Sequence, residues 1–370
     1  MNHLNVGIIG CGNISPIYFE AGKKFDVLNI VACADLNHEA AKQRAEEYNI
    51  PKACSVDELL SDPNIDLVIN LTIPKAHADI HIRALEAGKH SYGEKPLAID
   101  LKDAQKIQSI AKEKGLLVGA APDTFLGAGI QTCRKLIDDG WIGEPVSANA
   151  FMMYHGPEIF HPNPDFLYQF GAGPMFDMGP YYLTALINLI GPVKKVSGFT
   201  RKTFEERIIT GKQNYGRTFP VETPTHVSGI MEFDKGAIGT IITSFDVWGT
   251  KLPNIEIHGS LGSIIVPDPN HFGGTVYVKR HNYSEFVEVP LTHGFDTNSR
   301  GLGVVDMANA IINGQEHRAN AEMSYHVLEI MHGFYLSSES NTHYELNSTC
   351  KKPEPFPMNF LKNGIGYEQK

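Results

Sequence analysis

A Glu94-Lys95-Pro96 motif directly after a short predicted strand is the first place where this sequence could do chemistry. Oxidation of a secondary alcohol requires an acceptor for the hydride and a base that takes the hydroxyl proton. The Lys95 amine can act as that base when burial and a neighbouring positive charge hold it in its neutral form. A surface lysine at a strand end is the alternative. A Lys-Pro pair that ends a sheet strand favours the catalytic interpretation.

Asp177 and Tyr181 form a second candidate pair, one helical turn apart on the same predicted face. Asp177 is expected to bind a substrate hydroxyl or to orient Lys95, and Tyr181 to share the proton path. The alternatives are a helix N-terminal acid favoured by the helix dipole and an ordinary core tyrosine.

Five histidines are further candidates for a role in binding or catalysis. His155 and His161 flank a proline-rich loop whose polar side chains could contact sugar hydroxyls, and His161 is the stronger candidate. His226 stands at a strand start and is expected to be structural. His77 and His81 lie four residues apart on one predicted helix, a spacing that can bind zinc. Because no Glu or Cys completes such a site, we predict no metal.

A glycine-rich turn follows the first predicted strand, residues 4–9, and opens a helix. Gly10 allows a tight turn, and Gly12 lets the backbone approach a pyrophosphate at the positive end of the helix. Asp35 ends the second strand, where a carboxylate accepts hydrogen bonds from a ribose and repels a 2′-phosphate. These positions predict NAD, with NADP disfavoured, and contacts between the cofactor and Gly10, Gly12, Asn13, Ile14 and Asp35.

The order of strands and helices predicts two domains. Strands and helices alternate through residues 1–123, which indicates an α/β fold with a doubly wound parallel sheet of the Rossmann type. Residues 124–370 contain short strands joined by tight turns, followed by two helices and an irregular tail. They predict an α+β domain with an open, mostly antiparallel sheet. Because an open sheet needs a cover, we expect a homo-oligomer paired through this C-terminal sheet.

The composition excludes several classes of protein. The 370 residues are 42% hydrophobic and carry a formal net charge of −10. Without a basic block, nucleic acids and anionic membranes are disfavoured as partners, and no apolar run reaches the ~20 residues of a membrane helix. The chain enters a strand within a few residues, which leaves no room for a secretory signal. Five scattered cysteines without CxxC spacing indicate buried, reduced thiols in a cytoplasmic protein.

These motifs together resemble the Gfo/Idh/MocA family, which includes glucose–fructose oxidoreductases, inositol dehydrogenases and related sugar dehydrogenases. The resemblance runs from residue 4 to about residue 335 and also rests on the segments 72–74, 87–90, 142–145 and 177–181. It implies a Rossmann domain, a second domain with an open sheet, and reversible oxidation of a carbinol carbon in a sugar or polyol. It further implies that the cofactor contacts Thr72, Pro74, His77, Glu94 and Lys95, and that the Lys95–Pro96 bond is cis.

The sequence departs from the family pattern at three places. The usual Asp-x-Gly-x-His ends in Tyr181, so the imidazole acid/base is missing there. A free phenol has a pKa near 10, which makes Lys95 the principal base. Pro122-Asp123-Thr124 replaces the Asn/Arg pair after the fifth strand, and Ser15 replaces the third glycine of the turn.

The leading hypothesis is an NAD-dependent dehydrogenase or reductase that acts on a sugar, cyclitol or glycoside, with Lys95 as general acid/base. An NAD-dependent glycosidase that oxidises C3 transiently is a second hypothesis, and a non-catalytic NAD-sensing regulator is a third. The presence of Lys95 weighs against the regulator, which needs no acid/base. Phe125, Trp141 and Trp248 are expected in the core or in a pocket wall.

Overall fold

The computed structural model describes residues 3–360, which divide into two compact units. The described part of the first unit comprises residues 3–128, 292–328 and 353–360, and the second comprises residues 129–291 and 329–352. The predicted boundary at residue 123 assigns everything after it to the second domain. In the structure, residues 292–328 and 353–360 belong to the first unit instead. The alternation of strands and helices along the chain does not indicate this.

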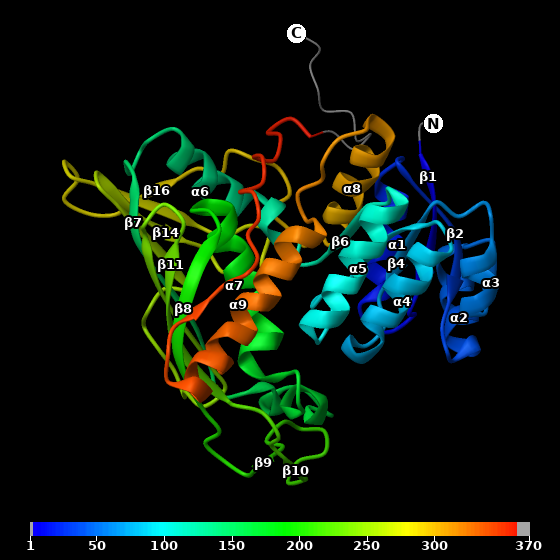
Figure 1. Ribbon diagram of the computed structural model, residues 1–370, viewed down its shortest axis with the longest axis horizontal. Helices are drawn as coiled ribbons and strands as arrows, with labels where there is room; N and C mark the ends of the chain where they lie inside the picture. Colours follow the sequence, from blue (N-terminus) through cyan, green and yellow to red (C-terminus); the bar gives the residue numbers. More distant parts are fainter. Residues whose placement is uncertain (1–2, 361–370) are drawn as a thin grey trace. The chain divides into compact units, whose positions relative to one another are not determined.

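The described residues of the first unit form a six-stranded parallel sheet (Figure 1). Its strand order is β3-β2-β1-β4-β5-β6, and every neighbouring pair runs parallel. The predicted Rossmann sheet is therefore confirmed. β3 was not predicted, because a strand of three residues is too short to show a hydrophobic pattern. The strands are β1 (Leu4–Ile9), β2 (Leu28–Ala34), β3 (Lys52–Cys54), β4 (Leu67–Asn70), β5 (His90–Gly93) and β6 (Val118–Ala120).

Local signals set the helix boundaries of this unit. Asn37 caps its helix by accepting a hydrogen bond from the Glu39 N–H, and Ser55 and Glu58 form a complete capping box. Gly115 ends a helix in the left-handed conformation, at φ 65°. The helices are α1 (Ser15–Lys24), α2 (His38–Tyr48), α3 (Val56–Ser61), α4 (Pro74–Glu86), α5 (Leu101–Lys114) and α8 (Leu302–Asn313).

The strand order places a topological switch point between β1 and β4. The chain leaves β1 toward β2 on one side and returns to β4 on the other, so the loops at the carboxyl ends of these strands diverge. Open α/β sheets bind ligands at such points. All four residues of β4 are buried, as a central parallel strand requires.

The described residues of the second unit form a nine-stranded sheet in the order β16-β15-β14-β13-β7-β12-β11-β8-β17. Only the pair of β7 and β12 runs parallel within it, which confirms a mostly antiparallel sheet. A separate hairpin pairs β9 (Glu206–Ile208) with β10 (Thr218–Pro220). The main strands are β7 (Pro145–Met153), β8 (Val193–Arg201), β11 (His226–Phe233), β12 (Ile238–Ser244), β13 (Ile255–Gly259), β14 (Gly262–Val266), β15 (Val276–Arg280), β16 (Val287–Val289) and β17 (Tyr344–Glu345).

Helix α7 (Gly173–Leu189) packs against β7, β11 and β12. The sequence predicts a helix near residues 178–189, but this start was wrong, because the helix begins at Gly173 and continues through Pro180. A proline inside a helix removes one N–H donor, which favours a start there when only the sequence is read. The long buried surface of α7 outweighs this loss. The remaining helices are α6 (Ala128–Asp138) and α9 (Ala321–Ser340).

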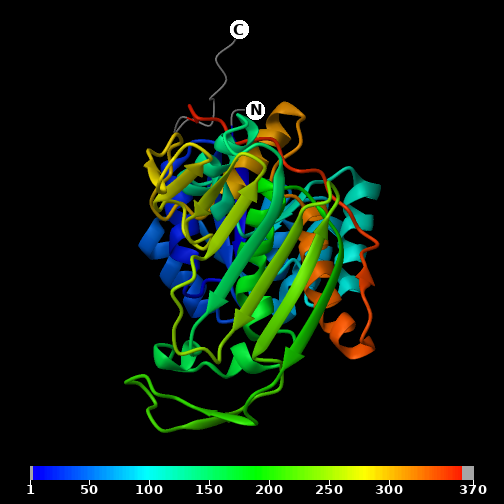
Figure 2. The ribbon, with the colours of Figure 1, turned by 90° about the vertical axis from the view of Figure 1, so that its left-hand side faces the viewer.

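The opposite face of the large sheet is open (Figure 2). Alternate residues on its strands are exposed, among them Phe199 on β8 and Ile230 on β11, with 73% and 53% of their surface accessible. The alternation agrees with the period of two expected for a sheet covered on one side. Residues 351–360 form no helix or strand, and the rest of the predicted tail lies outside the described residues.

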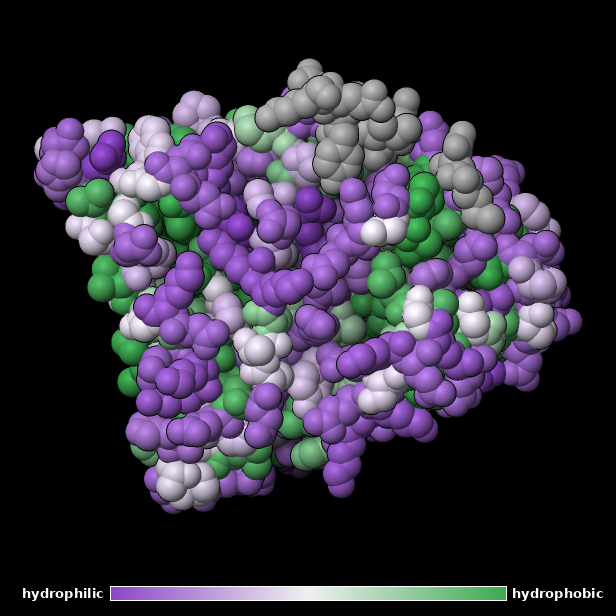
Figure 3. All heavy atoms as spheres, turned by 45° about the horizontal axis from the view of Figure 1, so that its top comes forward, coloured by the Kyte–Doolittle hydropathy of each residue, from purple (hydrophilic) through white to green (hydrophobic). Residues whose placement is uncertain are grey.

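All five cysteines are buried, as predicted, and none of them forms a disulfide. On the face shown in Figure 3, hydrophilic residues predominate and hydrophobic residues lie between them in small groups. Among residues 3–360, no helix combines the length and the apolar character that a membrane crossing needs.

Candidate active site

The glycine-rich turn at the end of β1 requires glycine at its first position. Gly10 has φ 103°, and a Cβ there would lie 2.5 Å from the carbonyl carbon of Leu71. Gly12 is different, because a Cβ there would meet no atom within 4 Å. At Gly10 the turn therefore packs closely against the residue after β4. At Gly12 there is free space next to the backbone, which a cofactor needs to approach it.

Ser15 stabilises this turn in place of the third glycine. Its side chain is fully buried, and its hydroxyl donates to the carbonyl of Gly12 at 2.8 Å. The N-cap residue of α1, Ile14, has no side-chain acceptor, and the first turn contains no acid. The positive end of α1 is therefore not neutralised by its own side chains, and an anionic pyrophosphate fits it.

Asp35 joins the glycine-rich turn to the loop after β2. One carboxylate oxygen accepts from the Cys11 N–H and the other from the Asn37 N–H, both at 2.8 Å. A carboxylate has about four lone-pair positions, so these two bonds leave acceptors for ribose hydroxyls. The position fits the predicted ribose contact.

Two apolar residues at the same sheet edge were missed in the sequence analysis. Leu36, directly after Asp35, is 99% exposed, and Ile73, just after β4, is 67% exposed. Exposed aliphatic side chains next to a hydrogen-bonding acid provide a surface for a flat, apolar base. Their position directly after strand ends was the feature of the sequence that could have identified them.

Glu94 is held in place by a buried tyrosine. Its Oε1 accepts from the Tyr18 hydroxyl of α1 at 2.7 Å, and its Oε2 accepts from the Lys95 N–H at 3.2 Å. Tyr18 is fully buried, and burial followed by the charge of Glu94 raises the pKa of this phenol. Tyr18 therefore stays a donor and positions Glu94, a role that no local sequence pattern indicates.

His77 ties two loops of the site together. Its Nδ1 lies 2.6 Å from the carbonyl oxygen of Pro96, and its Nε2 lies 3.0 Å from that of Thr72. The ring is only 1% exposed, and burial is the main cause that lowers its pKa. The contact of His77 with the cofactor stays a prediction. Its two bonds to the carbonyl oxygens of Pro96 and Thr72 position the turn at Lys95 and Pro96. The Lys95–Pro96 peptide bond is cis, as expected.

The neighbouring His81 is also structural. Its Nδ1 lies 2.8 Å from the Ser91 hydroxyl, and burial lowers its pKa to about 3. Both histidines of the i, i+4 pair are thus enclosed in the protein interior. Within the described range, no three His, Cys, Asp or Glu side chains are grouped to hold a metal ion.

Asp123, which stands where the family has its Asn/Arg pair, binds the start of α8. It is 1% exposed and accepts hydrogen bonds from the N–H groups of Gly301 at 2.8 Å and Gly303 at 3.0 Å. Burial raises its pKa to about 6, against the lowering effect of these bonds. Phe125 is buried in the core, as expected.

In the second unit, Asp177 and Tyr181 lie on α7. Asp177 is the fifth residue of the helix, so the alternative of a first-turn acid favoured by the dipole was wrong. Tyr181 is 9% exposed, and Asp177 is half-buried. Burial is the main cause that raises the pKa of Tyr154, and the charge of Asp177 adds to it.

The proline-rich loop carries His161 in a defined orientation. Its Nδ1 accepts from the Asn163 N–H at 3.1 Å, so the neutral ring has its proton on Nε2. His155 instead stacks on Trp248, with ring centres 3.5 Å apart. Trp248 is 82% exposed, which excludes the core and leaves a pocket wall as the predicted alternative. His226 bonds to the Ser244 hydroxyl at 2.9 Å, in line with a structural role.

A buried ion network supports this loop. Arg207 forms ion pairs with Glu158 and Asp246, and its distance from the Asp246 carboxylate is 2.8 Å. It also donates a hydrogen bond to the carbonyl of His155 at 3.0 Å. Glu158 also accepts from the Tyr168 hydroxyl. Because the partners are far apart in the sequence, no local pattern indicates this network.

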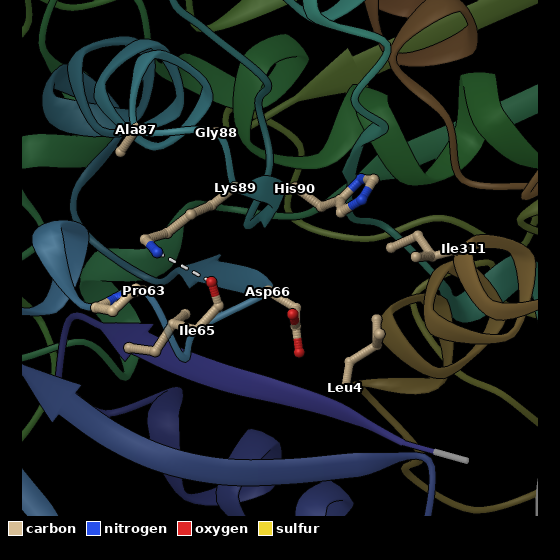
Figure 4. Close-up of a pocket in the computed structure, with 9 residues that line it drawn as sticks. All are labelled: Leu4, Pro63, Ile65, Asp66, Ala87, Gly88, Lys89, His90 and Ile311. Carbon is tan, nitrogen blue, oxygen red and sulfur yellow. Dashed lines mark hydrogen bonds between the residues drawn. The ribbon is translucent and has the colours of Figure 1, made fainter. Parts of the chain in front are cut away.

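A cavity of about 310 Å³ lies at the other edge of the first unit's sheet (Figure 4). It is lined by residues at the amino ends of β1, β4 and β5, including Leu4, Asp66 and His90. The Lys89 amine beside it is bound to the carbonyls of Asp62 at 2.6 Å and Ile65 at 2.9 Å. The glycine-rich turn and Glu94 are at the carboxyl ends, so this cavity is not the predicted cofactor site.

Family models match both parts of the chain. Residues 4–121 match the oxidoreductase family with an NAD-binding Rossmann fold, and residues 130–265 match the Gfo/Idh/MocA C-terminal domain. The chain belongs to the Gfo/Idh/MocA family. The predicted family, the oxidoreductase class and NAD as the cofactor are thereby confirmed.

Named relatives of this Gfo/Idh/MocA oxidoreductase act on sugars and cyclitols. Levoglucosan dehydrogenase of Pseudarthrobacter phenanthrenivorans is 26% identical over 291 residues, which cover 72% of this chain and 74% of that protein. Myo-inositol 2-dehydrogenase of Thermotoga maritima is 24% identical over 267 residues, covering 70% of this chain and 74% of the relative.

Solved structures share the fold of this oxidoreductase. A levoglucosan dehydrogenase in complex with NADH superposes with a TM-score of 0.81 at 22% identity, covering 94% of this chain and 100% of the other. An NAD-binding oxidoreductase from Klebsiella pneumoniae gives 0.80 at 24% identity, covering 93% and 99%.

Proposed function

We propose that this oxidoreductase transfers a hydride between NAD and a secondary alcohol or ketone of a sugar, cyclitol or glycoside, with Lys95 as general acid/base. The observation that carries the proposal is that hydrogen bonds fix the residues before and after Lys95. Tyr18 holds Glu94 before it, and His77 bonds to the Pro96 carbonyl after it. A proton-transfer group needs such a fixed position. The substrates named for the relatives support the substrate class.

The residues at the carboxyl ends of β1, β2 and β4 fit NAD, which supplies a hydride acceptor when bound. The Gly10–Ser15 turn and the start of α1 would hold the pyrophosphate. Asp35 would accept bonds from the ribose hydroxyls, and Leu36 and Ile73 would contact the adenine. We propose a preference for NAD over NADP, because the Asp35 carboxylate repels a 2′-phosphate.

Proton transfer is assigned to this chain's own side chains. In the oxidation, Lys95 takes the hydroxyl proton while the carbon loses its hydride, and in the reduction it returns the proton. Glu94, fixed by Tyr18, holds the backbone of Lys95 through its N–H. Asp177, Tyr181 and His161 are proposed to bind substrate hydroxyls and to share the proton path.

The test is a screen of hexoses, inositols and glucosides with NAD, in which the wild type is compared with Lys95→Met. We expect NADH formation on at least one substrate class and a loss of at least about 100-fold in kcat in the variant, because general acid–base catalysis contributes about that much. NADH affinity, measured by titration, should be retained. Unchanged turnover would overturn the role of Lys95.

Two other results of this screen would replace the proposal. Cleavage of aryl glucosides without net NADH would identify an NAD-dependent glycosidase. NADH binding without turnover of any substrate by the wild type would favour a regulator.

We also propose that the open face of the large sheet pairs two copies of the chain. Phe199 and Ile230 leave apolar area in water that pairing would bury. Ile230→Glu should lower the mass measured by light scattering, whereas Leu336→Glu on the exposed side of α9 should not. A wild-type monomer would exclude this interface. The five cysteines are buried and form no disulfide, which fits the cytoplasm that we propose as the compartment of this protein.

A further inference from the structure

Trp248 is an exposed aromatic residue with a fixed position. Its indole lies nearly parallel to the His155 ring, with centres 3.5 Å apart and 13° between the planes. The residue is nevertheless 82% exposed. One face of the indole rests on the imidazole, and the other is open to solvent. Neither core packing nor a hydrogen-bond network explains why such an apolar surface remains in water.

A second exposed ring lies next to the same backbone segment. Phe160 is 70% exposed and stacks with Tyr154 at a centroid distance of 6.4 Å. Tyr154 precedes His155 in the chain and packs edge-on against the buried Phe245 at 5.2 Å. We call Tyr154, His155, Phe160 and Trp248 the aromatic platform.

The platform rests on a rigid base. Arg207 donates to the carbonyls of His155 at 3.0 Å and Phe245 at 2.9 Å, while its charge is paired with Glu158 and Asp246. Asp246 also accepts from the hydroxyl of Thr225 at 2.6 Å. Because these groups are buried and bonded, the rings they support lose little conformational freedom on binding a ligand.

The composition of the platform indicates an uncharged ligand. Its rings offer π faces, which pack well against the C–H face of a pyranose. Arg207 is already paired with two carboxylates and is not available to an anionic ligand. A phosphate or a nucleotide diphosphate would need such a cation.

The platform also lies beside a candidate substrate group. Phe160 directly precedes His161, the candidate substrate group of the proline-rich loop, and His161 packs edge-on against Phe166 with ring centres 5.4 Å apart. Phe160 and Trp248 contact different members of the Tyr154–His155 pair, so the platform presents two exposed rings.

We propose that the aromatic platform binds an additional, uncharged sugar ring, so that the substrate is a glycoside or oligosaccharide rather than a free monosaccharide or a sugar phosphate. This inference rests on the proposed function for the chemistry, but binding can be measured without turnover.

The chain has only two tryptophans, which makes the test direct. In a Trp141→Phe background, fluorescence reports on Trp248 alone. We expect cellobiose or maltotriose to shift its emission to shorter wavelength saturably, at concentrations at least tenfold below those needed with glucose. Glucose 1-phosphate should produce no shift. If neither neutral saccharide changes the emission while NADH still binds, the proposal is wrong.

Kinetics separates this inference from the proposed function. With a substrate pair identified by the screen, Trp248→Ala should raise KM at least tenfold more for the two-ring substrate than for the one-ring substrate. Leu252→Ala, which removes another exposed side chain (51%), should leave that ratio unchanged. Equal effects of Trp248→Ala on both substrates would overturn the platform but not the dehydrogenase. An emission shift that depends on protein concentration alone would show that a second copy covers Trp248, which also overturns the proposal.

Discussion

Replacement of Asp123 by asparagine should change how stability depends on pH. Two effects oppose each other at this buried carboxylate. The N–H groups of Gly301 and Gly303 favour the ionised form, whereas removal from water disfavours it. Arg300 favours the charge and Glu94 opposes it, and burial is the largest effect. The net result is a pKa raised from 3.8 to about 6.

The size and sign of the effect follow from this difference. Between pH 4 and pH 6 the folded protein keeps a proton on Asp123 that the unfolded chain has lost, so stability falls as pH rises through this range. A rise of about two pKa units corresponds to about 3 kcal/mol, at about 1.4 kcal/mol for each unit. Below pH 4 both states are protonated, and above pH 6 the loss is complete.

The measurement is urea unfolding of the wild type and Asp123→Asn between pH 4 and pH 7.5, with Asp139→Asn on the surface as control. The asparagine keeps the size of the side chain but does not titrate. The wild type should lose about 3 kcal/mol relative to Asp123→Asn as pH rises, and the control should follow the wild type. A flat difference would mean that the two N–H bonds balance burial, and a wild type that gains stability with pH would mean that they outweigh it; either result would refute the reasoning.

Two further changes test the cofactor and catalytic assignments. Tyr18→Phe keeps the buried ring but removes the bond to Glu94, so we expect kcat to fall about tenfold while unfolding free energy drops by only about 1–3 kcal/mol. An unchanged kcat would show that the Glu94 position does not matter for catalysis. Asp35→Ser should raise the Kd for NADH at least about tenfold, since it removes the bonds to the Cys11 and Asn37 N–H groups. The ratio of the NADPH Kd to the NADH Kd should decrease, because the carboxylate no longer repels the 2′-phosphate. Titration with both cofactors measures this, and an unchanged ratio of affinities would contradict the role of Asp35.

Features that depend on a few consecutive residues were predictable. Ser55 and Glu58 stand three residues apart, a spacing that predicts a capping box, and the structure contains it; Gly115 ends its helix. Gly10 and Asp35 lie at the ends of the strands that their sequence context indicates. The start of α7 was misread for the same reason, because Pro180 is a strong local signal that long-range packing overrides.

The Rossmann alternation, the glycine-rich turn and the Glu94-Lys95 motif can be predicted from the amino-acid sequence, because hydrophobic period, backbone conformation and side-chain chemistry act over short stretches of chain. The contacts that hold the motif in place depend on the folded chain. Tyr18 reaches Glu94, and Arg207 joins Glu158 to Asp246, across separations that carry no periodic signal. The same holds for the exposure of Trp248, which depends on what the rest of the fold leaves uncovered. Such pairings form only when the strands and helices pack together, so no local pattern can indicate them.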